Sequence, residues 1–534
     1  MPTTQLAIPI LVVGAGPVGA MLAAELAHHG VPSLVVDRSA TTSRHPKMDF
    51  LNGRSMEHYR RLGLVEEIRA HGVPSDQLFN FHWTERLDQP PVSVWEYPSV
   101  DQVRQRMAQV NDGTMPCEAY QRVIGSRLEE LGRRHLHRLD LVDLREGWTF
   151  ERFTQDDDGV SAAVVETATG QRLQVRARYL VGCDGANSAV RRIAGIDPAG
   201  TGSGMGPALE HRDVFFRSAD PALHRYGRFF LTIASRGLTL VSRDGEQLWT
   251  GTFPLFDDEQ RDADPVAVIR ERLGIDLTID EVLAVAHWKG QLAVAQAYRC
   301  GSVFLAGDSA HQFFPTGGHG ANTGLGDAVD LGWKLAAAVN DWAGDRLLDS
   351  YQAERRPVAL FNREMCANLL DVWRRYPVLA ACGASRGQLA GFLDHERYQI
   401  DNTGIHFGDR YRDSPVVQRE QGVEPAWDWQ RIVATTWPGG RLPSVRLADG
   451  TELYDLLGPA LTLLDTSGSR AGAVLVDEAA GLGVPLAHVV IDDPHVRQVL
   501  QRDLVVVRPD QHVAWRGDQP PADPAMVLGL VVGN

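Results

Sequence analysis

The chain has 534 residues, a net charge of −15, 44% hydrophobic residues and 23% charged residues. This length predicts several domains, the composition excludes wholesale disorder, and the negative charge argues against nucleic acid as a partner. Its five cysteines are far apart and never form a C-x-x-C pair. We therefore expect no disulfide framework, no metal site and no dithiol redox centre, in a protein of the reducing cytoplasm.

The first part of the chain has the pattern of a dinucleotide-binding unit. An apolar strand at 10–13 is followed by a helix-forming stretch at 20–29 and by a second apolar strand at 31–36. The turn after the first strand has the G-x-G-x-x-G spacing, with Gly14, Gly16 and Gly19. Such a turn lets a pyrophosphate approach the N–H groups at a helix N-terminus. Asp37 ends the second strand, where a carboxylate can accept hydrogen bonds from ribose hydroxyls.

Residues 8–27 are mostly apolar and about as long as a membrane-spanning helix. Pro17 and the glycines of the turn fall in the middle of this stretch, and no basic segment or small-residue cleavage site accompanies it. A strand, a turn and a buried helix account for it better, so we predict no membrane segment.

Two amphipathic helices are predicted at 54–64 and 121–131, before a middle region with a different pattern. Residues 205–290 alternate aromatic and β-branched residues with polar ones, and the runs at 229–233 and 249–253 resemble strands. Such strands are expected to form a sheet that walls a pocket. The polar residues of this sheet that are candidates for contacting a substrate are Tyr226, Arg228, His211 and Arg236.

A second cofactor-binding pattern lies much later in the chain. A buried strand at 302–305 leads into Gly307-Asp308, and a loop rich in glycine at 315–322 leads into a long helix at 323–339. The Asp308 carboxylate can accept from a ribityl hydroxyl, while the loop and the helix N-terminus can hold pyrophosphate or the N1–C2=O edge of a flavin. A dehydrogenase that binds only NAD has no use for this segment, so the pattern favours FAD.

A third segment at 180–192 contains a strand, an Asp184-Gly185 turn and the start of a helix, and the turn predicts a helix cap. Together the three segments resemble the fingerprints of the group A flavoprotein monooxygenases, the aromatic hydroxylases similar to p-hydroxybenzoate hydroxylase. The resemblance extends to residues 54–64, 351–357 and 507–516. The last stretch is typical of the subgroup with a C-terminal thioredoxin-like domain, which comprises phenol-type hydroxylases and tailoring hydroxylases of polyketide and indolocarbazole pathways.

The resemblance implies an α/β fold with a Rossmann-like FAD-binding domain, an inserted β-sheet substrate domain and a C-terminal thioredoxin-like α/β domain. The expected bounds are 1–75, 100–200 and 290–370 for the discontinuous FAD-binding domain, 76–99 and 201–289 for the substrate domain, 371–430 for a helical connector, and 431–534 for the thioredoxin-like domain. No cysteine follows Cys382, so the last domain is expected to lack redox chemistry and to serve for packing or as an interface.

The FAD contacts of the family can be transferred residue by residue. The expected cofactor-binding residues are Gly14, Gly16, Val18, Gly19, Asp37, Arg38, Lys47, Gln121, Asp184, Asp308, Pro315, Gly318, Gly320, Ala321 and Asn322. Asp184 belongs to the motif that the family links with both FAD and NAD(P)H. Lys47 stands where the resemblance implies an arginine, so the charge is kept while the bidentate geometry is not.

The resemblance implies that NADPH or NADH reduces FAD, that O₂ then gives a C4a-hydroperoxyflavin, and that its terminal oxygen passes to an aromatic, phenolic substrate. This is aromatic hydroxylation in natural-product tailoring or aromatic catabolism. The resemblance is also compatible with a protein that forms a homodimer. The catalytic candidates are His319, Arg228 and Tyr226; His319 is either a solvated loop residue or a contact for substrate or proton relay. Baeyer–Villiger oxygenation, epoxidation and an oxidase reaction without oxygen insertion stay open as alternatives.

Overall fold

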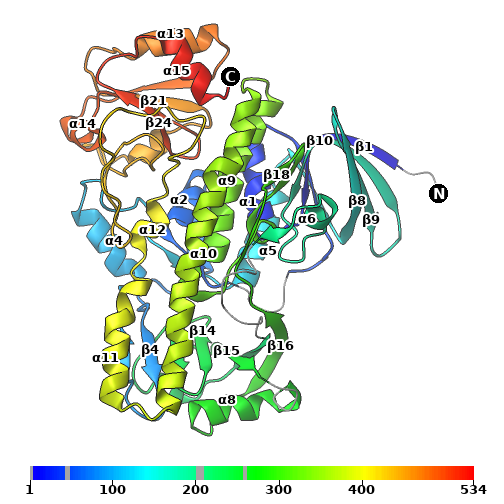
Figure 1. Cartoon of the computed structure of the whole chain (residues 1–534), viewed down its shortest axis with the longest axis vertical. Helices are drawn as coiled ribbons and strands as arrows, with labels where there is room; N and C mark the ends of the chain where they lie inside the picture. The colour runs from blue at the N-terminus through cyan, green and yellow to red at the C-terminus, as the bar shows by residue number, and fades with distance from the viewer. Residues whose placement is uncertain (1–3, 43–47, 200–209, 257–260) are drawn as a thin grey trace.

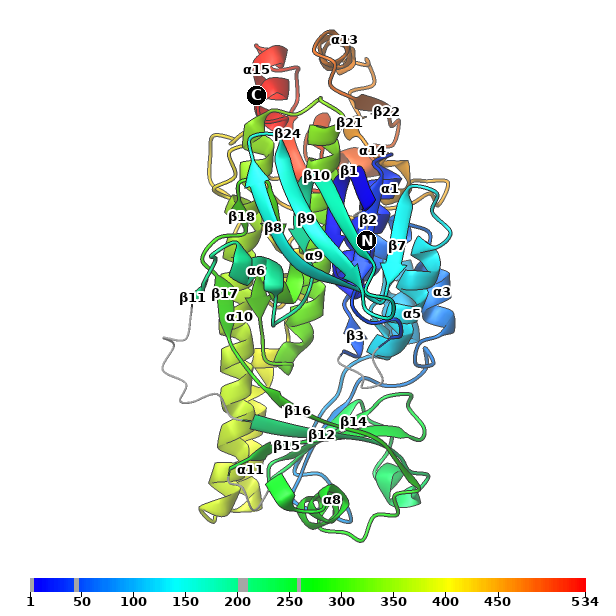
Figure 2. The ribbon, with the colours of Figure 1, turned by 90° about the vertical axis from the view of Figure 1, so that its right-hand side faces the viewer.

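The computed structural model describes residues 4–42, 48–199, 210–256 and 261–534, so Lys47 lies outside the described residues. The molecule is elongated and consists of three sheet-based parts in a row (Figure 1 and Figure 2). An eight-stranded sheet forms the middle part, a seven-stranded sheet the lower part and a four-stranded sheet the upper part.

The middle sheet has the order β18-β19-β10-β1-β2-β7, in which all neighbours from β19 to β7 are parallel. The strands of this part are β1 (Thr4–Val13), β2 (Ser33–Asp37), β7 (Val142–Glu146), β8 (Trp148–Asp156), β9 (Gly159–Glu166), β10 (Arg172–Gly182), β18 (Arg299–Cys300) and β19 (Val303–Leu305). Strands β8 and β9 form an antiparallel extension from β10. Because parallel strands are covered on both faces, their apolar residues follow one another without alternation.

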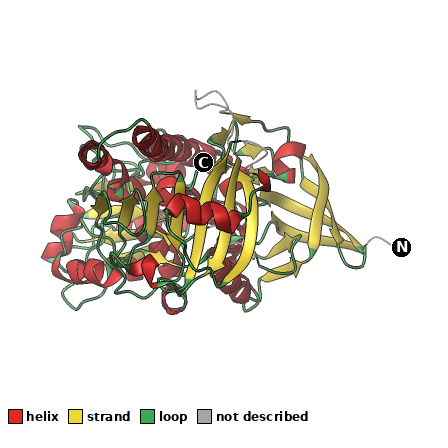
Figure 3. Cartoon of the chain, turned by 90° about the horizontal axis from the view of Figure 1, so that it is seen from below, coloured by secondary structure: helices red, strands yellow, loops and turns green. Residues whose placement is uncertain are grey.

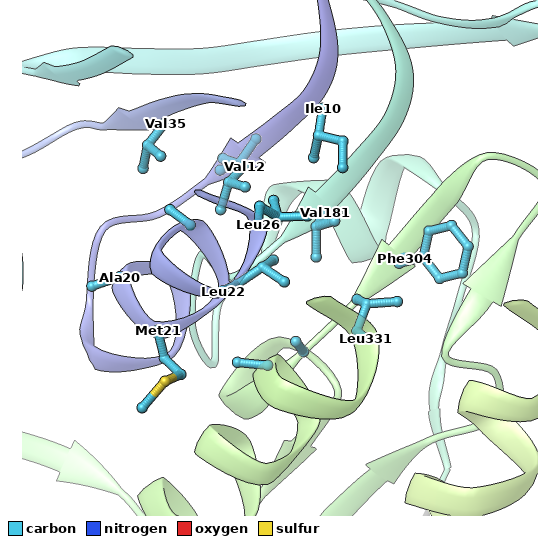
Figure 4. Packing of buried hydrophobic residues seen from close by; sticks show 14 of the residues in the cluster. Ile10, Val12, Ala20, Met21, Leu22, Leu26, Val35, Val181, Phe304 and Leu331 are labelled. Carbon is cyan, nitrogen blue, oxygen red and sulfur yellow. The ribbon is translucent and has the colours of Figure 1, made fainter. Parts of the chain in front are cut away.

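Helices α1 (Pro17–His28) and α9 (His319–Val339) pack against each other and against this sheet. Figure 4 shows Leu22 of α1 and Leu331 of α9 in one core with Ile10 and Val12 of β1. The other elements of the middle part are β3 (Phe50–Leu51), α2 (Gly53–Arg61), α3 (Val65–Ala70), α4 (Val100–Gln109), β6 (Gln121–Arg122), α5 (Gly125–Leu136), α6 (Ala189–Ile193), β11 (Pro198–Ala199), β17 (Ala293–Ala295), η2 (Gly307–Ser309), β20 (His311–Gln312) and η3 (Thr316–Gly318).

The lower sheet has the order β16-β12-β15-β14-β13-β4-β5 and is antiparallel except for the pair β13–β4. Its elements are β4 (Phe81–Thr84), β5 (Ser93–Trp95), β12 (Glu210–Arg217), η1 (Pro221–His224), β13 (Leu231–Ala234), β14 (Leu238–Ser242), β15 (Leu248–Leu255), α8 (Pro265–Leu273) and β16 (Glu281–Lys289). Helix α8 crosses one face of this sheet, where Ile269 and Leu273 are buried (Figure 3).

A 37-residue helix, α10 (Asp345–Ala381), runs from the middle part down to the lower sheet (Figure 1). Together with α11 (Arg386–Glu396) it packs on the edge of the sheet that contains Trp83 and Trp95. The following segment has little regular structure apart from η4 (Arg397–Ile400) and α12 (Thr403–Phe407). Helix α10 therefore ties the two sheets together along one side of the space between them.

The upper part is an α/β domain with the sheet order β22-β21-β23-β24, in which β21 and β22 are parallel and the other pairs are antiparallel. Its elements are η5 (Leu453–Leu456), β21 (Leu461–Asp465), α13 (Ala473–Gly481), β22 (Leu486–Val490), α14 (Pro494–Leu500), β23 (Leu504–Val507), β24 (Val513–Gly517) and α15 (Pro524–Val531). The predicted fold class is confirmed, with a parallel-sheet domain, an inserted β-sheet domain and a C-terminal α/β domain.

Two predicted helices have other bounds in the structure. The helix predicted at 121–131 lies at 125–136, because Gln121 and Arg122 pair with β3 as a strand. The helix predicted from Thr323 already begins at His319, so the glycine-rich loop is shorter than expected. Among the described residues, none of the helices combines the length and the apolar character that a membrane crossing requires.

Candidate active site

A cavity of about 3200 Å³ lies between the middle and lower sheets. Its lining includes the glycine-rich turn before α1, the end of β2, the segment that leads into α9, one face of the lower sheet and part of α10. This volume is well above the roughly 300–1,000 Å³ of an ordinary ligand pocket. The predicted cofactor segments and the predicted pocket sheet therefore share one space.

The first glycine turn is shaped by close backbone approaches. Gly14 has a φ of +107°, and a Cβ atom there would lie 2.4 Å from the carbonyl oxygen of Cys183. A Cβ atom at Gly19 would lie 1.9 Å from the carbonyl oxygen of Gly14. Gly16, in contrast, has no atom within 4 Å of its Cβ position and lines the cavity. The turn thus presents bare backbone and the N-terminus of α1 to the cavity, which fits a pyrophosphate group.

Asp37 is fixed at the edge of the cavity by the backbone around it. Its carboxylate accepts hydrogen bonds from the N–H groups of Ala15 at 2.7 Å and Ser39 at 2.8 Å. Arg133 lies 3.5 Å from the same carboxylate. Val18 and Arg38 line the cavity beside it. This arrangement holds the carboxylate where a ribose would pass, as the sequence predicts for the ADP half of FAD.

Asp184 and Asp308 both line the cavity, at the ends of neighbouring strands. The carboxylate of Asp184 caps α6 by accepting from the N–H groups of Ala189 at 2.6 Å and Val190 at 3.2 Å. The expected helix cap is therefore present. Asp308 belongs to the tight turn η2 directly after β19, which is the position expected for a contact to the ribityl chain.

The loop before α9 combines two left-handed glycines with an open helix end. Gly317 and Gly318 have φ values of +77° and +69°. Gly320 has no atom within 4 Å of its Cβ position, and the first turn of α9 contains no acidic residue. Pro315 and Ala321 line the cavity with these glycines. The positive end of the helix dipole here suits the N1–C2=O edge of a flavin.

Asn322 stands behind this loop and joins three segments. Its amide nitrogen donates to the carbonyl oxygens of Gly318 at 2.6 Å and Phe50 at 3.0 Å. Its amide oxygen accepts from the N–H group of Asn52 at 3.0 Å and from the Ser55 hydroxyl at 2.6 Å. Asn322 thus fixes the shape of the loop from the side opposite the cavity.

His319 does not line the large cavity. It is 4% exposed and faces a small chamber of about 40 Å³ behind the loop, next to His406 at a ring distance of 5.4 Å. Burial lowers the pKa of His319 to about 4. The side chain is therefore neither solvated in a loop nor placed among the residues that surround the cavity.

The amide group of Gln121 does not face the large cavity either. Its nitrogen donates to the carbonyl oxygens of Val73 at 2.9 Å and Arg122 at 3.0 Å, and its oxygen accepts from Arg69 at 3.1 Å. Gln121 is 1% exposed and is not among the residues that line the cavity. In this structure it holds strand β6 against the segment at Val73.

The structure corrects the placement of two predicted catalytic residues. The Tyr226 hydroxyl donates to the carbonyl oxygen of Asp88 at 2.8 Å, and the Arg228 guanidinium donates to that of Gly245. Both side chains are exposed and neither lines the cavity. The reason is that strand β13 begins only at Leu231, so residues 226–228 belong to an outer loop.

The other two candidates on the sheet do line the cavity. His211 stacks on Trp288 at a ring distance of 4.6 Å, and the Arg236 guanidinium donates to the carbonyl oxygen of Glu271 at 2.9 Å. His211 lies on β12 and Arg236 in the turn between β13 and β14, so both belong to the sheet itself and not to the outer loop.

Several cavity residues were missed by the sequence analysis. Phe79 stacks at 4.6 Å on Phe230, which belongs to the predicted run at 229–233, and the alternation of Phe79 with Phe81 could have indicated one shared face. Asp49, directly before β3, and Arg243, directly after β14, also line the cavity. Burial raises the pKa of Asp49, which pairs with Arg122 at 3.0 Å.

Two family models match most of the chain. An FAD binding domain matches residues 7–362, and an aromatic-ring hydroxylase C-terminal domain matches residues 435–533. The FAD-dependent monooxygenase apdD of Emericella nidulans is 34% identical and aligns with 95% of this chain and 87% of its own. The tetracenomycin B2 monooxygenase-dioxygenase of Streptomyces olivaceus is 32% identical and aligns with 99% of both chains.

Solved structures give the same picture. The rebeccamycin biosynthetic enzyme RebC with reduced flavin superposes with a TM-score of 0.87 and 32% identity, covering 99% of this chain and 100% of that chain. Aklavinone-11 hydroxylase with FAD and aklavinone has a TM-score of 0.82 and 26% identity, covering 100% of this chain and 99% of that chain.

The glycine turn, the fixed Asp37 carboxylate and the matched domain define an FAD-binding flavoprotein. The chain belongs to the FAD-dependent aromatic-ring hydroxylases, which are monooxygenases. The predicted family and enzyme class are thereby confirmed.

Proposed function

We propose that this monooxygenase hydroxylates a multi-ring phenolic substrate in natural-product tailoring, with NADPH or NADH as reductant and O₂ as the oxygen source. One observation supports this above all: a single cavity of about 3200 Å³ joins the glycine turn at Gly16 to the aromatic wall at Phe79 and Phe230. Such a space has room for a dinucleotide cofactor and a large ligand together. Relatives named for tetracenomycin B2 and aklavinone support a substrate of comparable origin.

When bound, FAD supplies the oxygen-transfer chemistry. The residues of this chain bind the cofactor, orient the substrate ring and keep water away from the reacting atoms. Leu231, Ile233 and Val241 offer an apolar floor for the ring, and Phe230 offers an aromatic wall. We place the substrate between this floor and the Gly317–Ala321 loop.

A side chain near the substrate hydroxyl can favour the phenolate by accepting its proton. Of the polar residues predicted on the sheet, His211 lines the cavity at the junction of the two sheets and is held by stacking on Trp288. We therefore propose that His211, and not Tyr226 or Arg228, contacts the substrate hydroxyl. Asp49 and Arg243 also line the cavity, and we expect them to contribute to the charge around that hydroxyl.

The test is a screen of multi-ring phenols for stimulated NAD(P)H oxidation by the FAD-loaded protein, followed by mass spectrometry under ¹⁸O₂. One labelled oxygen atom on an aromatic carbon is the expected product. A labelled lactone or epoxide would favour the Baeyer–Villiger or epoxidase alternative. A product without label would favour an oxidase and would contradict the proposal. Asp308→Ala is the control, because it removes a proposed FAD contact and should lower flavin content.

The cysteines support an enzyme of the reducing cytoplasm. All five thiols are free, and Cys117 and Cys366 are buried. The C-terminal domain contains none of them. We propose that this domain has a structural role, since thiol chemistry is not available to it.

A further inference from the structure

The loop at 508–512 of the C-terminal domain reaches into the FAD-binding part of the molecule. The Arg508 side chain has no exposed surface, and its guanidinium donates to Glu354 of α10 at 2.6 Å and to Asp330 of α9 at 3.1 Å. It also donates to Asp510 of its own loop at 2.6 Å. The loop is thus anchored where the two long helices of the FAD-binding part lie side by side.

Three carboxyl groups meet at this anchor, and two cationic side chains of the chain lie against them. Lys334 lies 2.7 Å from Asp330 and also bonds to Glu354. With Arg508, the site contains two cationic side chains against three carboxyls, and burial raises the pKa of Asp330 well above its ordinary value. The cluster therefore acts as a buried ion-pair anchor, and buried pairs are strongly destabilised when one member is removed.

From this anchor the loop contacts α2 through Arg54. The Arg54 guanidinium donates to the carbonyl oxygen of Asp510 at 2.7 Å, to the side-chain oxygen of Gln511 and to Glu57 at 3.0 Å. Glu57 in turn accepts from Arg441 of the upper part at 2.9 Å. All these groups are buried, so the first turns of α2 are joined firmly to the C-terminal domain.

The same turns of α2 hold the loop at 317–321, which we call the flavin loop because the flavin ring is proposed to lie there. Asn52 caps α2, and Asn52 and Ser55 both bond to the amide oxygen of Asn322. Asn322 bonds in turn to the carbonyl oxygen of Gly318. Hydrogen bonds therefore link the C-terminal loop to Arg54 and link Asn52 and Ser55 to the loop at 317–321, and the backbone of the first turn of α2 joins the two sets.

Gln511 has a left-handed backbone in the turn between β23 and β24, where its N–H group donates to the carbonyl oxygen of Arg508 at 2.9 Å. Its φ of +66° is in the left-handed region, which a residue with a Cβ atom adopts only at a penalty. It is 2% exposed. Such a conformation persists where the surrounding contacts require it, and it is found preferentially at functional sites.

We propose that the loop at 508–512 is a brace that positions the flavin loop, with Arg54 and Gln511 as positioning residues. The loop at 508–512 then contributes to the active site although none of its residues lines the cavity. This inference rests on the proposed placement of the flavin ring at Gly317–Ala321.

Two glycine variants separate the brace from general stability. Gln511→Gly removes the contact to Arg54 and at the same time removes the backbone penalty. Gln501→Gly is the matched control, because Gln501 has the same φ of +66° but bonds only within the upper part, to Thr435, Ala434 and Arg516. Both variants are expected to fold, since glycine adopts this φ without strain.

The readout is amide hydrogen exchange of residues 316–323 in the FAD-loaded protein, together with the Kd for FAD. In Gln511→Gly the exchange should be at least about tenfold faster than in the wild type and the Kd should rise. In Gln501→Gly both should stay at the wild-type values. Equal exchange in the two variants would overturn the brace.

Arg54→Lys provides an independent check. Lysine keeps the positive charge beside Glu57 but cannot form the two-pronged contact to Asp510 and Gln511. Faster exchange at 316–323 is expected here as well, and wild-type exchange would contradict the proposal. The exchange measurement needs no substrate, so a failure of the proposed hydroxylation leaves this test independent.

Discussion

The two ends of the large cavity are built in different ways. At the end that receives the ADP half of FAD, contiguous backbone forms the site, with Gly14, Gly16 and Asp37 within one strand–turn–helix–strand unit. At the substrate end, side chains such as Phe79, Phe230 and Trp288 come from segments far apart in the sequence. The first end tolerates almost no change of residue type, because atoms of the backbone are in contact. The second end is a surface whose shape can change one side chain at a time.

The largest effect that would test this difference is expected from Gly14→Ala. The new methyl group would lie 2.4 Å from a carbonyl oxygen and at a φ of +107°, so the turn must shift. We expect the Kd for FAD, measured by fluorescence titration, to rise by at least about 100-fold, or about 2.7 kcal/mol. Gly30→Ala is the control: its φ is +76°, but no atom lies within 4 Å of the new methyl group, and FAD binding should stay normal.

A variant of His319 tests whether the face of the flavin loop that is turned away from the cavity is buried. In the folded protein its pKa is about 4, against an ordinary value of 6.5, because burial disfavours the charged ring. The unfolded chain therefore takes up the proton first, and stability is lost as the pH falls from about 6.5 towards 4. His319→Asn should remove this loss, which is about 2 kcal/mol at pH 5.

The measurement is urea unfolding of wild type and His319→Asn at pH 7 and pH 5. The difference between the two proteins should change by the stated amount in favour of the variant at the lower pH. An unchanged difference would mean that the ring is hydrated and belongs to the cavity side of the loop.

Thr239→Trp tests whether the substrate end of the cavity can be changed without affecting FAD binding. Thr239 lines the cavity from β14, so a tryptophan there fills space that the substrate needs. We expect kcat/KM for a multi-ring substrate to fall by about tenfold or more, a barrier change of about 1.4 kcal/mol. The Kd for FAD should not change. Thr169→Trp, at an exposed turn, is the control for the added indole; a parallel loss of FAD would show that the two ends are not independent.

The smallest effects are expected from Tyr226→Phe and Arg228→Met. Both side chains are exposed and bond to backbone carbonyl oxygens of neighbouring loops, away from the cavity. Surface changes of this kind alter free energies by about 0.5 kcal/mol or less, so turnover should stay within about twofold. A loss of turnover with normal folding would restore them as catalytic residues.

The cofactor end could be predicted from the sequence because each motif is continuous. The glycine turn, the Asp184 cap and the Asp308 turn need only the residues next to them, and helix and strand patterns place each one. The assignment of Gln121 to a helix was wrong because two residues of β-pairing, with Phe50 and Leu51, outweighed the helical spacing that follows.

The substrate end and the brace could not be predicted in this way. The start of β13 at Leu231 decides which polar residues face the cavity, and the sequence pattern does not fix such a boundary. Arg54 and Gln511 are 457 positions apart, so no local pattern connects them. The length and composition of the C-terminal part indicate a domain but say nothing of the surface it covers.

The anchor of Arg508 also has a consequence for the order in which the molecule can be made. Asp330, Lys334 and Glu354 leave the ribosome long before Arg508 does, and until then Asp330 and Glu354 lack the hydrogen bonds that Arg508 donates to them. We therefore expect helices α9 and α10 to pack less tightly during synthesis of the FAD-binding part than in the complete protein. Nascent chains of this enzyme should remain loosely packed around the cofactor site until nearly all of the described sequence has been translated.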